Sequence, residues 1–336
     1  MRSVPTKPRI ATVIGDPAGI GPEVCVKALA TGAPQSRSIP ILIGNIDAIV
    51  DAARICRVDL PLRPVEPARV AELGDTDRIA VIDPGNLRSD EYTVGEPSGP
   101  AARAGVEWIR LAQELAAAGA IAGFIMGPMN HKALALGGIA REFSEVPEFE
   151  PPGTWQLRIN GPLRAVPLTE HVRLRDVPQT VTREAVFRLI VTVDEHLRRW
   201  GIAHPRIAVA GLNPHAMFEE DAERIAPAVA DARGRGIDAS GPISPDAVFR
   251  QGLEGRSDAI VTMYHDQGQI AVKTAAFAGA CTVFLNLPYV RMGIPHGTAY
   301  DIAGTGKAQH LTMLSAMNIA AALASGRGFA DAAERN

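Results

Sequence analysis

Short apolar runs that alternate with longer amphipathic segments place the strongest limit on the fold of this chain. Such runs occupy residues 10–14, 39–43, 79–82, 121–126, 163–168, 207–212, 259–263 and 282–285. Their length suits buried strands, whereas residues 182–200 carry apolar side chains at helical spacing. Strands that alternate with helices pair mainly in parallel, so we predict an α/β fold with mainly parallel sheets. The length of 336 residues favours two domains.

Bulk composition excludes several classes of partner. Apolar residues make up 46% of the chain and charged residues 21%, as in ordinary soluble globular proteins. The net charge of −3 predicts neither nucleic acid nor an anionic membrane as a partner. No apolar run approaches the roughly 20 residues of a membrane span, and the first run is too short for a signal peptide. The widely spaced Cys25, Cys56 and Cys281 also suit a cytoplasmic protein.

Three of the apolar runs end in a polar segment that carries a histidine, namely His171, His215 and His265. In open α/β sheets the carboxyl ends of the strands carry the chemistry. One such histidine is more often structural than functional, but three in the same position relative to a strand indicate a shared site. His131 and Lys132 follow a fourth run, where they are candidates for substrate contact or ordinary loop residues.

The residue types at these ends suit metal chemistry. Neutral imidazoles bind ions such as Zn, Co, Ni or Mn, and three protein ligands with one open position form a catalytic metal site. Asp266 beside His265 extends a ligand or acid–base cluster, and Lys273 and Arg291 suit an anionic substrate. These groups fit a metal-assisted alcohol oxidation or a hydrolysis, and spacing alone does not choose between them. The histidines expected on the surface are His196, His204 and His310.

The first apolar run leads into a glycine-rich turn at residues 15–23, and a helical stretch follows it. Glycines let backbone amides approach a ligand closely, and a helix N-terminus favours anions. The turn matches neither the GxGxxG fingerprint of dinucleotide-binding folds nor the GxxxxGK[ST] phosphate loop. By itself it therefore indicates a tight connection as readily as a ligand site.

Four motifs together resemble one enzyme family. They are Gly-Asp-Pro-Ala-Gly-Ile-Gly-Pro-Glu at 15–23, Gly-Leu-Asn-Pro-His-Ala at 211–216, Met-Tyr-His-Asp-Gln-Gly at 263–268, and His-Gly-Thr-Ala at 296–299 followed by Asp-Ile-Ala-Gly at 301–304. They are similar to signatures of the 4-hydroxythreonine-4-phosphate dehydrogenases of vitamin B6 synthesis and their paralogues. The last motif also resembles the adenosine-binding loop of the related isopropylmalate and isocitrate dehydrogenases.

The resemblance implies a two-domain α/β/α architecture like that of isocitrate and isopropylmalate dehydrogenases. Residues 1–126 plus 285–336 would form a terminal domain, and residues 127–284 a central domain with the metal ligands and the dimer contacts. The active site would lie in a cleft between the domains that both subunits of a homodimer complete. The implied activity is oxidation of a CH–OH group, of the oxidative decarboxylation type, with NAD or NADP and one divalent ion (Zn, Co, Mn, Ni or Mg).

The resemblance also implies roles for individual residues. The metal ligands would be His171, His215 and His265, and the catalytic groups Lys273 and Asp266. Substrate contacts would come from Lys273, Arg291, Thr282, His131 and Lys132. The cofactor would contact His296, Gly297, Asp301, Gly304, Gly306, Asp16 and Gly19.

One region departs from the family pattern and bears on the substrate. Members that act on the phosphorylated substrate carry Gly-His-Thr-Glu-Phe after a Gly-Pro-x-x-Lys loop, whereas residues 141–147 read Arg-Glu-Phe-Ser-Glu-Val-Pro, and Thr282 replaces a family asparagine. Carboxylates repel a phosphate, so we predict a preferred substrate other than 4-hydroxythreonine 4-phosphate. The resemblance implies a hydroxy acid similar to 4-hydroxythreonine 4-phosphate or a substrate of a related paralogue. The paralogue candidates are a cis-dihydrodiol of a phthalate- or terephthalate-type carboxylate and a D-threonate or erythronate 4-phosphate. A metal-dependent hydrolase or aldolase without NAD is the alternative class.

Overall fold

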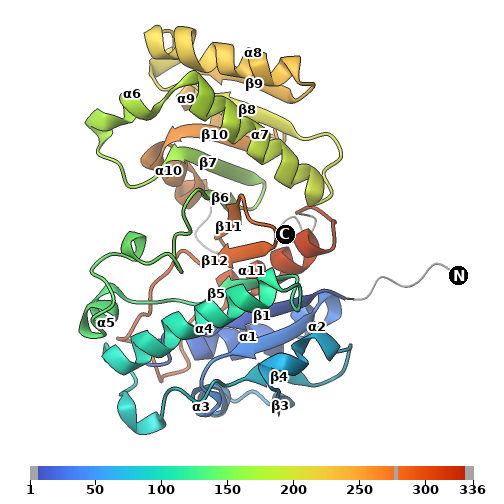
Figure 1. Cartoon of the computed structure of the whole chain (residues 1–336), viewed down its shortest axis with the longest axis vertical. Coiled ribbons are helices and arrows are strands. Elements are labelled where there is room, and N and C mark those ends of the chain that lie inside the picture. The colour runs from blue at the N-terminus through green and yellow to red at the C-terminus, as the bar shows by residue number, and fades with distance from the viewer. Residues whose placement is uncertain (1–6, 276–278, 330–336) are drawn as a thin grey trace, which may run out of the picture. The chain divides into compact units, whose positions relative to one another are not determined.

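The chain forms two compact α/β units, seen in a computed structural model that describes residues 7–275 and 279–329 (Figure 1). The terminal unit comprises the described residues up to Gly153 together with Leu287–Ser325. The central unit comprises Thr154–Asn286 and the described residues from Gly326 onward. Residues 1–6, which include the basic start of the chain, and residues 330–336 of the expected terminal domain lie outside the described residues.

Twelve strands and eleven α-helices make up the regular structure of the described residues. The strands are β1 (Arg9–Val13), β2 (Ile39–Ile43), β3 (Leu62–Pro64), β4 (Ile79–Ile82), β5 (Gly123–Met126), β6 (Trp155–Asn160), β7 (Leu163–Thr169), β8 (Arg206–Ala210), β9 (Asp238–Ile243), β10 (Ala259–Tyr264), β11 (Cys281–Leu285) and β12 (Val290–Gly293). The helices are α1 (Gly21–Ala30), α2 (Ala33–Arg37), α3 (Ile46–Cys56), α4 (Gly99–Ala117), α5 (His131–Leu136), α6 (Val177–Thr180), α7 (Arg183–Arg199), α8 (Ala226–Gly234), α9 (Pro245–Leu253), α10 (His265–Ala275) and α11 (Leu311–Ala324).

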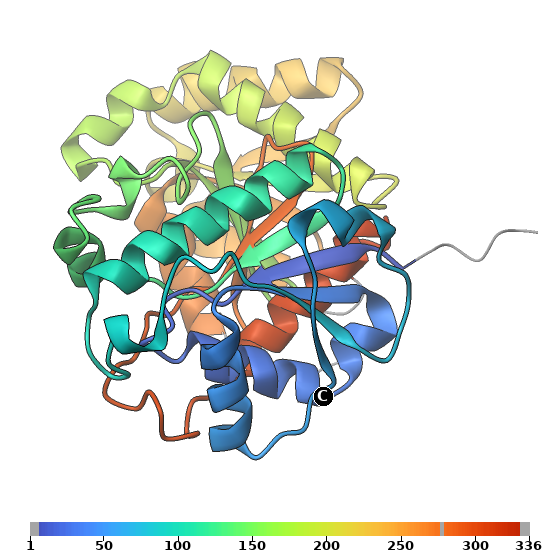
Figure 2. The same cartoon turned by 60° about the horizontal axis from the view of Figure 1, so that its bottom comes forward.

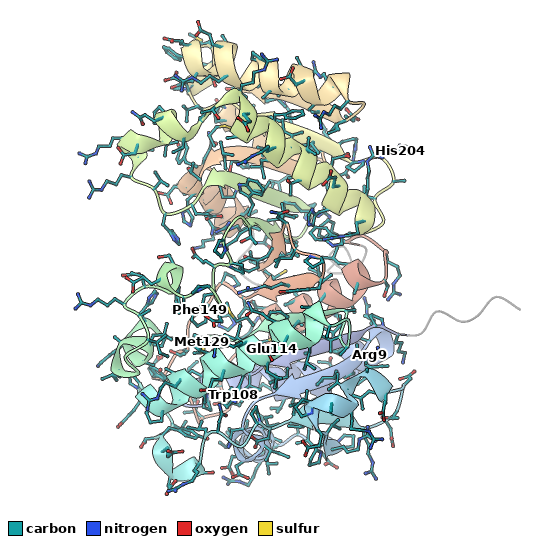
Figure 3. The ribbon with its side chains drawn as sticks, viewed as in Figure 1. Arg9, Trp108, Glu114, Met129, Phe149 and His204 are labelled. Carbon is teal, nitrogen blue, oxygen red and sulfur yellow. The ribbon has the colours of Figure 1, made fainter. Side chains whose placement is uncertain are left out.

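The terminal unit is built on a parallel sheet with the strand order β3-β4-β2-β1-β5-β12. Helix α4 covers one face of this sheet, and α1 and α11 cover the other (Figures 1 and 2). Helix α4 begins where the Ser98 side chain accepts a hydrogen bond from the Ala101 amide, and it buries Trp108 against the sheet (Figure 3). Apolar side chains on both faces of the central strands account for their continuous apolar sequence.

The central unit carries the strand order β11-β6-β7-β10-β8-β9. Strands β7, β10, β8 and β9 are parallel, whereas β6 runs antiparallel to both of its neighbours. On one face Ala165 and Ile260 pack with Val248 of α9 and Val272 of α10. The alternate residues of the strands point to the opposite face, which α7 covers (Figure 1).

The predicted α/β class is confirmed, and the eight apolar runs all contain strands of the structure. Four strands, β3, β6, β9 and β12, lack a clear apolar run. Strand β6 reads Trp-Gln-Leu-Arg-Ile-Asn, and β9 contains a glycine and a proline, as an edge strand permits. The prediction that His196 lies on the surface is wrong, because His196 is buried on α7. Its Nδ1 bonds to the Thr192 carbonyl, and its Nε2 accepts a hydrogen bond from the Asn286 amide.

The division between the units differs from the expected boundary near residue 127. Residues 127–153 belong to the terminal unit, where two contacts hold the end of this segment. The Arg291 guanidinium of β12 donates to the carbonyls of Glu148 and Phe149, and Arg110 of α4 forms an ion pair with Glu148. In the part of the chain that the structure describes, no helix has the length and apolar character to cross a membrane.

Candidate active site

The three predicted metal ligands all follow strands of the central sheet. Strand β10 pairs in parallel with β7 on one side and β8 on the other, so the carboxyl ends of all three strands lie at one edge. His171 stands two residues after β7, and His265 is the first residue of α10, directly after β10. His215 lies in the short 3₁₀ turn η5 (Pro214–Ala216) that follows β8. The predicted arrangement of strand-end histidines is therefore present in this unit.

His171 and His265 lie beside each other, with their ring centroids 5.4 Å apart. Two imidazoles that bind one tetrahedral ion through nitrogens at about 2.0–2.1 Å have centroids roughly 5 Å apart, so this pair fits a shared ion. The Oδ1 of Asp266 lies 2.8 Å from the Nδ1 of His265. In the tautomer that donates from Nδ1, this contact orients the ring and leaves Nε2 able to bind a metal.

His215 has a left-handed backbone conformation, with φ at 58°. It interacts electrostatically with Asp246 of α9. The pKa of Asp246 is lowered mainly by a hydrogen bond from the Ser244 hydroxyl and to a smaller extent by His215. Among the described residues, no group of three His, Cys, Asp or Glu side chains is placed to hold a metal ion. The structure thus brings together two of the three predicted ligands and keeps His215 at the same edge of the sheet.

Two predicted substrate contacts also belong to the central unit. Lys273 is exposed in the last turn of α10. Thr282 of β11 lies opposite Arg158 of β6, on the sheet face that α10 covers. The amide of Asn160 ties β6 to this helix by donating to the Val272 carbonyl at 2.8 Å. Lys273 and Thr282 therefore belong to two elements, α10 and β11, that both contact β6.

In the terminal unit, the glycine-rich turn and the loop at residues 296–306 form one cluster. The Tyr300 hydroxyl donates to Oδ2 of Asp16 at 2.5 Å, and the Ala18 amide donates to Oδ1 at 2.9 Å. Asp16 is fully buried, and burial raises its pKa despite both hydrogen bonds. Gly19 packs against Thr298 so closely that an added Cβ would lie 2.8 Å from the Thr298 carbonyl oxygen. This close approach explains why the position needs a glycine.

Two further contacts join the start of α1 to the same loop. Oε1 of Glu23 accepts a hydrogen bond from the Gly304 amide at 2.6 Å. The Lys27 ammonium donates to the carbonyls of Gly306 and Ala308. The structure therefore brings Asp16, Gly19, Gly304 and Gly306, four of the predicted cofactor contacts, into one cluster.

Two polar atoms of this cluster are buried and have unsatisfied hydrogen-bonding capacity in the described part of the chain. Among the described residues, His296 Nε2 and Glu23 Oε2 have no hydrogen-bond partner, although both atoms are inaccessible. Burial lowers the pKa of His296, so its imidazole is neutral around pH 7 and offers either a donor or an acceptor. Gly297 and Asp301 are exposed in the same loop. This set of groups fits the hydroxyl, amino and ring-nitrogen groups of a nucleotide cofactor.

The remaining predicted substrate contacts lie in the terminal unit. Arg291 is fully buried in β12, and desolvation lowers its pKa to about 10, so the side chain stays charged at neutral pH. His131 and Lys132 are exposed in the first turn of α5. The His131 ring lies 3.8 Å from the ring of Phe143, and Nδ1 lies 3.6 Å from a carboxylate oxygen of Glu142.

Several residues of these clusters were not predicted from the sequence. Glu23 lies inside a motif that the sequence identified, so its role could have been anticipated from the buried start of α1. Thr298 likewise lies inside the quoted motif at 296–299. Tyr300 and Lys27 gave no signal, because their contacts join segments more than 270 residues apart in the chain. The ion pair of Arg158 in β6 with Glu170, the residue between β7 and His171, was not predicted either.

Comparisons with known proteins agree with these motifs. The sequence profile of the family described as "Pyridoxal phosphate biosynthetic protein PdxA" matches residues 36–320. A Novosphingobium aromaticivorans protein, provisionally named 4-hydroxythreonine-4-phosphate dehydrogenase, is 44% identical over 97% of this chain and 98% of its own length. A Clostridium botulinum protein, provisionally named D-threonate 4-phosphate dehydrogenase, is 36% identical over 94% of this chain and 96% of its own.

Solved structures give the same result. The 4-hydroxythreonine-4-phosphate dehydrogenase of Klebsiella pneumoniae has a TM-score of 0.81 and 35% identity, over 94% of this chain and 99% of that one. A terephthalate 1,2-cis-dihydrodiol dehydrogenase of Burkholderia xenovorans LB400 has a TM-score of 0.68 and 28% identity, over 91% and 95% of the two chains. These relatives are named as dehydrogenases, which supports an oxidoreductase that acts on CH–OH groups. By the family profile and the identity to its relatives, this chain belongs to the family of the pyridoxal phosphate biosynthetic protein PdxA.

Proposed function

We propose that this protein is a dehydrogenase that oxidises a hydroxyl of a small anionic acid with NAD or NADP and requires one divalent metal ion. The observation that carries the proposal is the His171–His265 pair at the carboxyl edge of the central sheet, with Asp266 against His265. Zn, Co, Mn, Ni and Mg remain candidates for the ion. A single-chain set of two adjacent imidazoles needs at least one further ligand, for which we propose His215.

Each group of the chain has a defined task in this proposal. A bound divalent ion would polarise the substrate oxygen and ease loss of its proton. Asp266 holds the His265 ring in the orientation that exposes Nε2. Lys273 either pairs with the anionic group of the substrate or transfers a proton to or from the reacting oxygen. Thr282 contributes a hydroxyl on the same sheet face. Where the oxidised hydroxyl is β to a carboxylate, the ketone formed would lose CO₂.

We propose that the loop at 296–306 and the glycine-rich turn bind the cofactor. His296 Nε2 and Glu23 Oε2 are the buried atoms that a nucleotide would satisfy. Gly297, Asp301, Gly304 and Gly306 would bring the loop backbone and one carboxylate to the adenosine end. A carboxylate beside the ribose favours NAD, because it can accept a hydrogen bond from the free 2′-hydroxyl. The 2′-phosphate of NADP needs a cationic side chain at that place.

The relatives act on different substrates by name, so the substrate is the finer part of the proposal. The names of two relatives specify 4-phosphates of small hydroxy acids, and a third specifies a cis-dihydrodiol of terephthalate. Residues 141–149 contain three glutamates, of which Glu148 is neutralised by Arg110 and Glu145 accepts a hydrogen bond from the Arg141 amide. Glu142 is exposed beside His131. The exposed carboxylate of Glu142, next to the proposed substrate contact His131, therefore supports a substrate other than 4-hydroxythreonine 4-phosphate.

A dihydrodiol of an aromatic carboxylate is the second candidate substrate, and one observation favours it. The rings of His131, Phe143 and Phe149 contact one another in sequence, the first pair tilted and the second edge-on, with centroid distances of 3.8 Å and 5.1 Å. Phe149 is labelled in Figure 3. A carbocyclic ring would pack on such an aromatic surface better than a flexible, strongly hydrated phosphate.

We further propose that the active protein is a cytoplasmic homodimer whose subunits share the active site through the central unit. Among the described residues of one chain, no three potential ligand side chains are placed to hold one ion, and this supports a site that both subunits complete. Sedimentation at micromolar concentration, together with an activity assay at the same concentration, checks this arrangement. A monomer with full activity would contradict a shared site.

The competing class is a metal-dependent hydrolase or aldolase that uses the same histidines without a nicotinamide. Calorimetric titration of the purified protein with NAD and with NADP separates the two classes. The dehydrogenase predicts saturable binding of one of them, weakened by His296→Ala. Absence of binding for both cofactors would favour the hydrolase.

A further inference from the structure

The central unit contains an ion pair between a buried arginine and a half-buried glutamate next to one of the proposed metal ligands. Arg158 of β6 is 6% exposed, and its two terminal nitrogens donate to the two carboxylate oxygens of Glu170 at 2.5 and 2.7 Å. One of these nitrogens also donates to the Gln156 carbonyl at 2.8 Å. A bidentate pair of this kind fixes the orientation of both side chains as well as their separation.

Glu170 is the residue that connects β7 to His171. The preceding Thr169 is tied to β10, because its hydroxyl donates to the Met263 carbonyl at 3.0 Å. His171 and the five residues after it are exposed, so the segment that carries this imidazole leaves the sheet directly after the ion pair. The Arg158–Glu170 contact is therefore the last side-chain anchor in the packed part of the unit before the ligand.

Stability alone is a poor explanation for this pair. Two charges that leave water lose hydration free energy, and an apolar pair of similar volume is often at least as stable in such a position. The fixed geometry of an arginine fork is useful where the position of a neighbouring group matters. The neighbour here is His171, whose ring must stay beside that of His265 to share an ion.

We infer that Arg158 is a positioning residue for His171: through Glu170 it holds the end of β7 so that His171 and His265 are arranged for one metal ion before the ion binds. The inference rests on the metal site of the proposed function. Loss of the pair should weaken metal binding because His171 becomes less well ordered, although no ligand side chain is removed. Side chains that orient metal ligands from behind typically contribute 10- to 100-fold in metal affinity.

The same unit provides a matched control pair. Arg206, the first residue of β8, donates to both carboxylate oxygens of Asp258, which precedes β10, at 3.1 Å each. Both residues lie at the amino ends of their strands, which is the opposite edge of the sheet from the histidines. Removal of this pair tests the effect of losing a two-bonded Arg–carboxylate pair without a change near the proposed site.

The test is a titration of the full-length, chelator-stripped protein with Co²⁺. Visible absorbance monitors the titration and reports both the affinity for the ion and the geometry of its ligands. The variants are Arg158→Met/Glu170→Gln, Arg158→Lys, His171→Ala and Arg206→Met/Asp258→Asn, each first checked for cooperative unfolding. We expect Arg158→Met/Glu170→Gln to raise the Kd for Co²⁺ by about 10- to 100-fold and to alter the absorbance band. Arg158→Lys, which keeps the charge but loses the fork, should give a smaller rise.

The control pair should leave the Kd within about twofold of the parent value. An unchanged Kd in Arg158→Met/Glu170→Gln, together with weak binding in His171→Ala, would overturn the inference and leave the metal site standing. Equal weakening by both double variants would also overturn it, because the effect would then be general. An unchanged Kd in His171→Ala would overturn both the inference and the proposed site. If the first double variant does not fold, Arg158→Lys decides by the same criteria.

Discussion

The Tyr300 hydroxyl donates to the buried carboxylate of Asp16 at 2.5 Å, and this contact fastens the loop at 296–306 to the glycine-rich turn. The two residues are 284 positions apart in the sequence. Asp16 also accepts a hydrogen bond from the Ala18 amide within its own turn. Both segments of the proposed cofactor site are thus held in place by one carboxylate.

Tyr300→Phe should weaken cofactor binding and lower stability. Removal of the hydroxyl leaves Oδ2 of Asp16 buried without this donor, which costs about 1–3 kcal/mol in the free energy of unfolding. The loosened loop should also raise the KM for the nicotinamide cofactor several-fold, while kcat changes less. Urea unfolding and steady-state kinetics measure the two effects. Tyr289→Phe, at a half-buried tyrosine outside both loops, is the control, and an equal effect there would contradict the assigned role.

Stability should depend on pH through Asp16. Burial raises the pKa of this carboxyl above its ordinary value of 3.8, so the native state binds more protons than the unfolded state just above that pH. The free energy of unfolding therefore falls as pH rises from 3.8 through the folded pKa. Asp16→Asn lacks this loss, so its stability relative to the parent should improve across that window. Parallel stability curves for the two proteins, or the same improvement in the exposed Asp59→Asn, would contradict the prediction.

Arg291 should stabilise the segment that precedes the central unit. Its guanidinium donates to the Glu148 and Phe149 carbonyls, and desolvation lowers its pKa only to about 10, so the contact persists at neutral pH. Arg291→Met should lower the free energy of unfolding by about 2–4 kcal/mol, because buried carbonyls lose a charged donor. It should also speed proteolysis within residues 141–150. Arg54→Met, at an exposed arginine, is the control; equal proteolysis in both variants would argue against this anchor.

The sequence predicted the parts of the fold that depend on local patterns. Apolar runs marked the buried parallel strands, and the strand-end histidines marked one edge of the central sheet. Strand β6 was missed because its alternating polar and apolar residues include a buried arginine, Arg158, which pairs with Glu170 directly after the next strand. Strand β12 was missed as well, because it lacks an apolar run and contains the buried Arg291, whose guanidinium donates to carbonyls distant in the sequence.

The site was predictable to a similar depth. Residue types and spacing identified the histidines, and the resemblance identified the loop at 296–306. The Tyr300–Asp16 and Glu23–Gly304 contacts could not be predicted, since each depends on two loops that meet only after folding. The pairing of His171 with His265 follows from the parallel register of β7 with β10, which the apolar runs do not specify.

Substrate preference should follow the charge and the contacting aromatic rings of residues 131–149. Turnover with both cofactors should be compared for 4-hydroxythreonine 4-phosphate, threonate and erythronate 4-phosphates, and cis-dihydrodiols of phthalate-type acids. We expect a substrate other than 4-hydroxythreonine 4-phosphate to give the highest kcat/KM. If a dihydrodiol is preferred, Phe143→Ala should lower kcat/KM about 10-fold or more, since aromatic packing is lost. A clear preference for 4-hydroxythreonine 4-phosphate would show that the acidic loop does not exclude the phosphate.

The most direct test of the metal-dependent dehydrogenase is the formation of reduced nicotinamide by chelator-stripped protein, before and after addition of one equivalent of Co²⁺ or Zn²⁺. The parent protein should be inactive when stripped and recover turnover with the ion. His171→Ala, His215→Ala and His265→Ala should fold normally and stay at least about 100-fold less active with the ion present. Full turnover by the stripped parent, or by His215→Ala, would contradict the account.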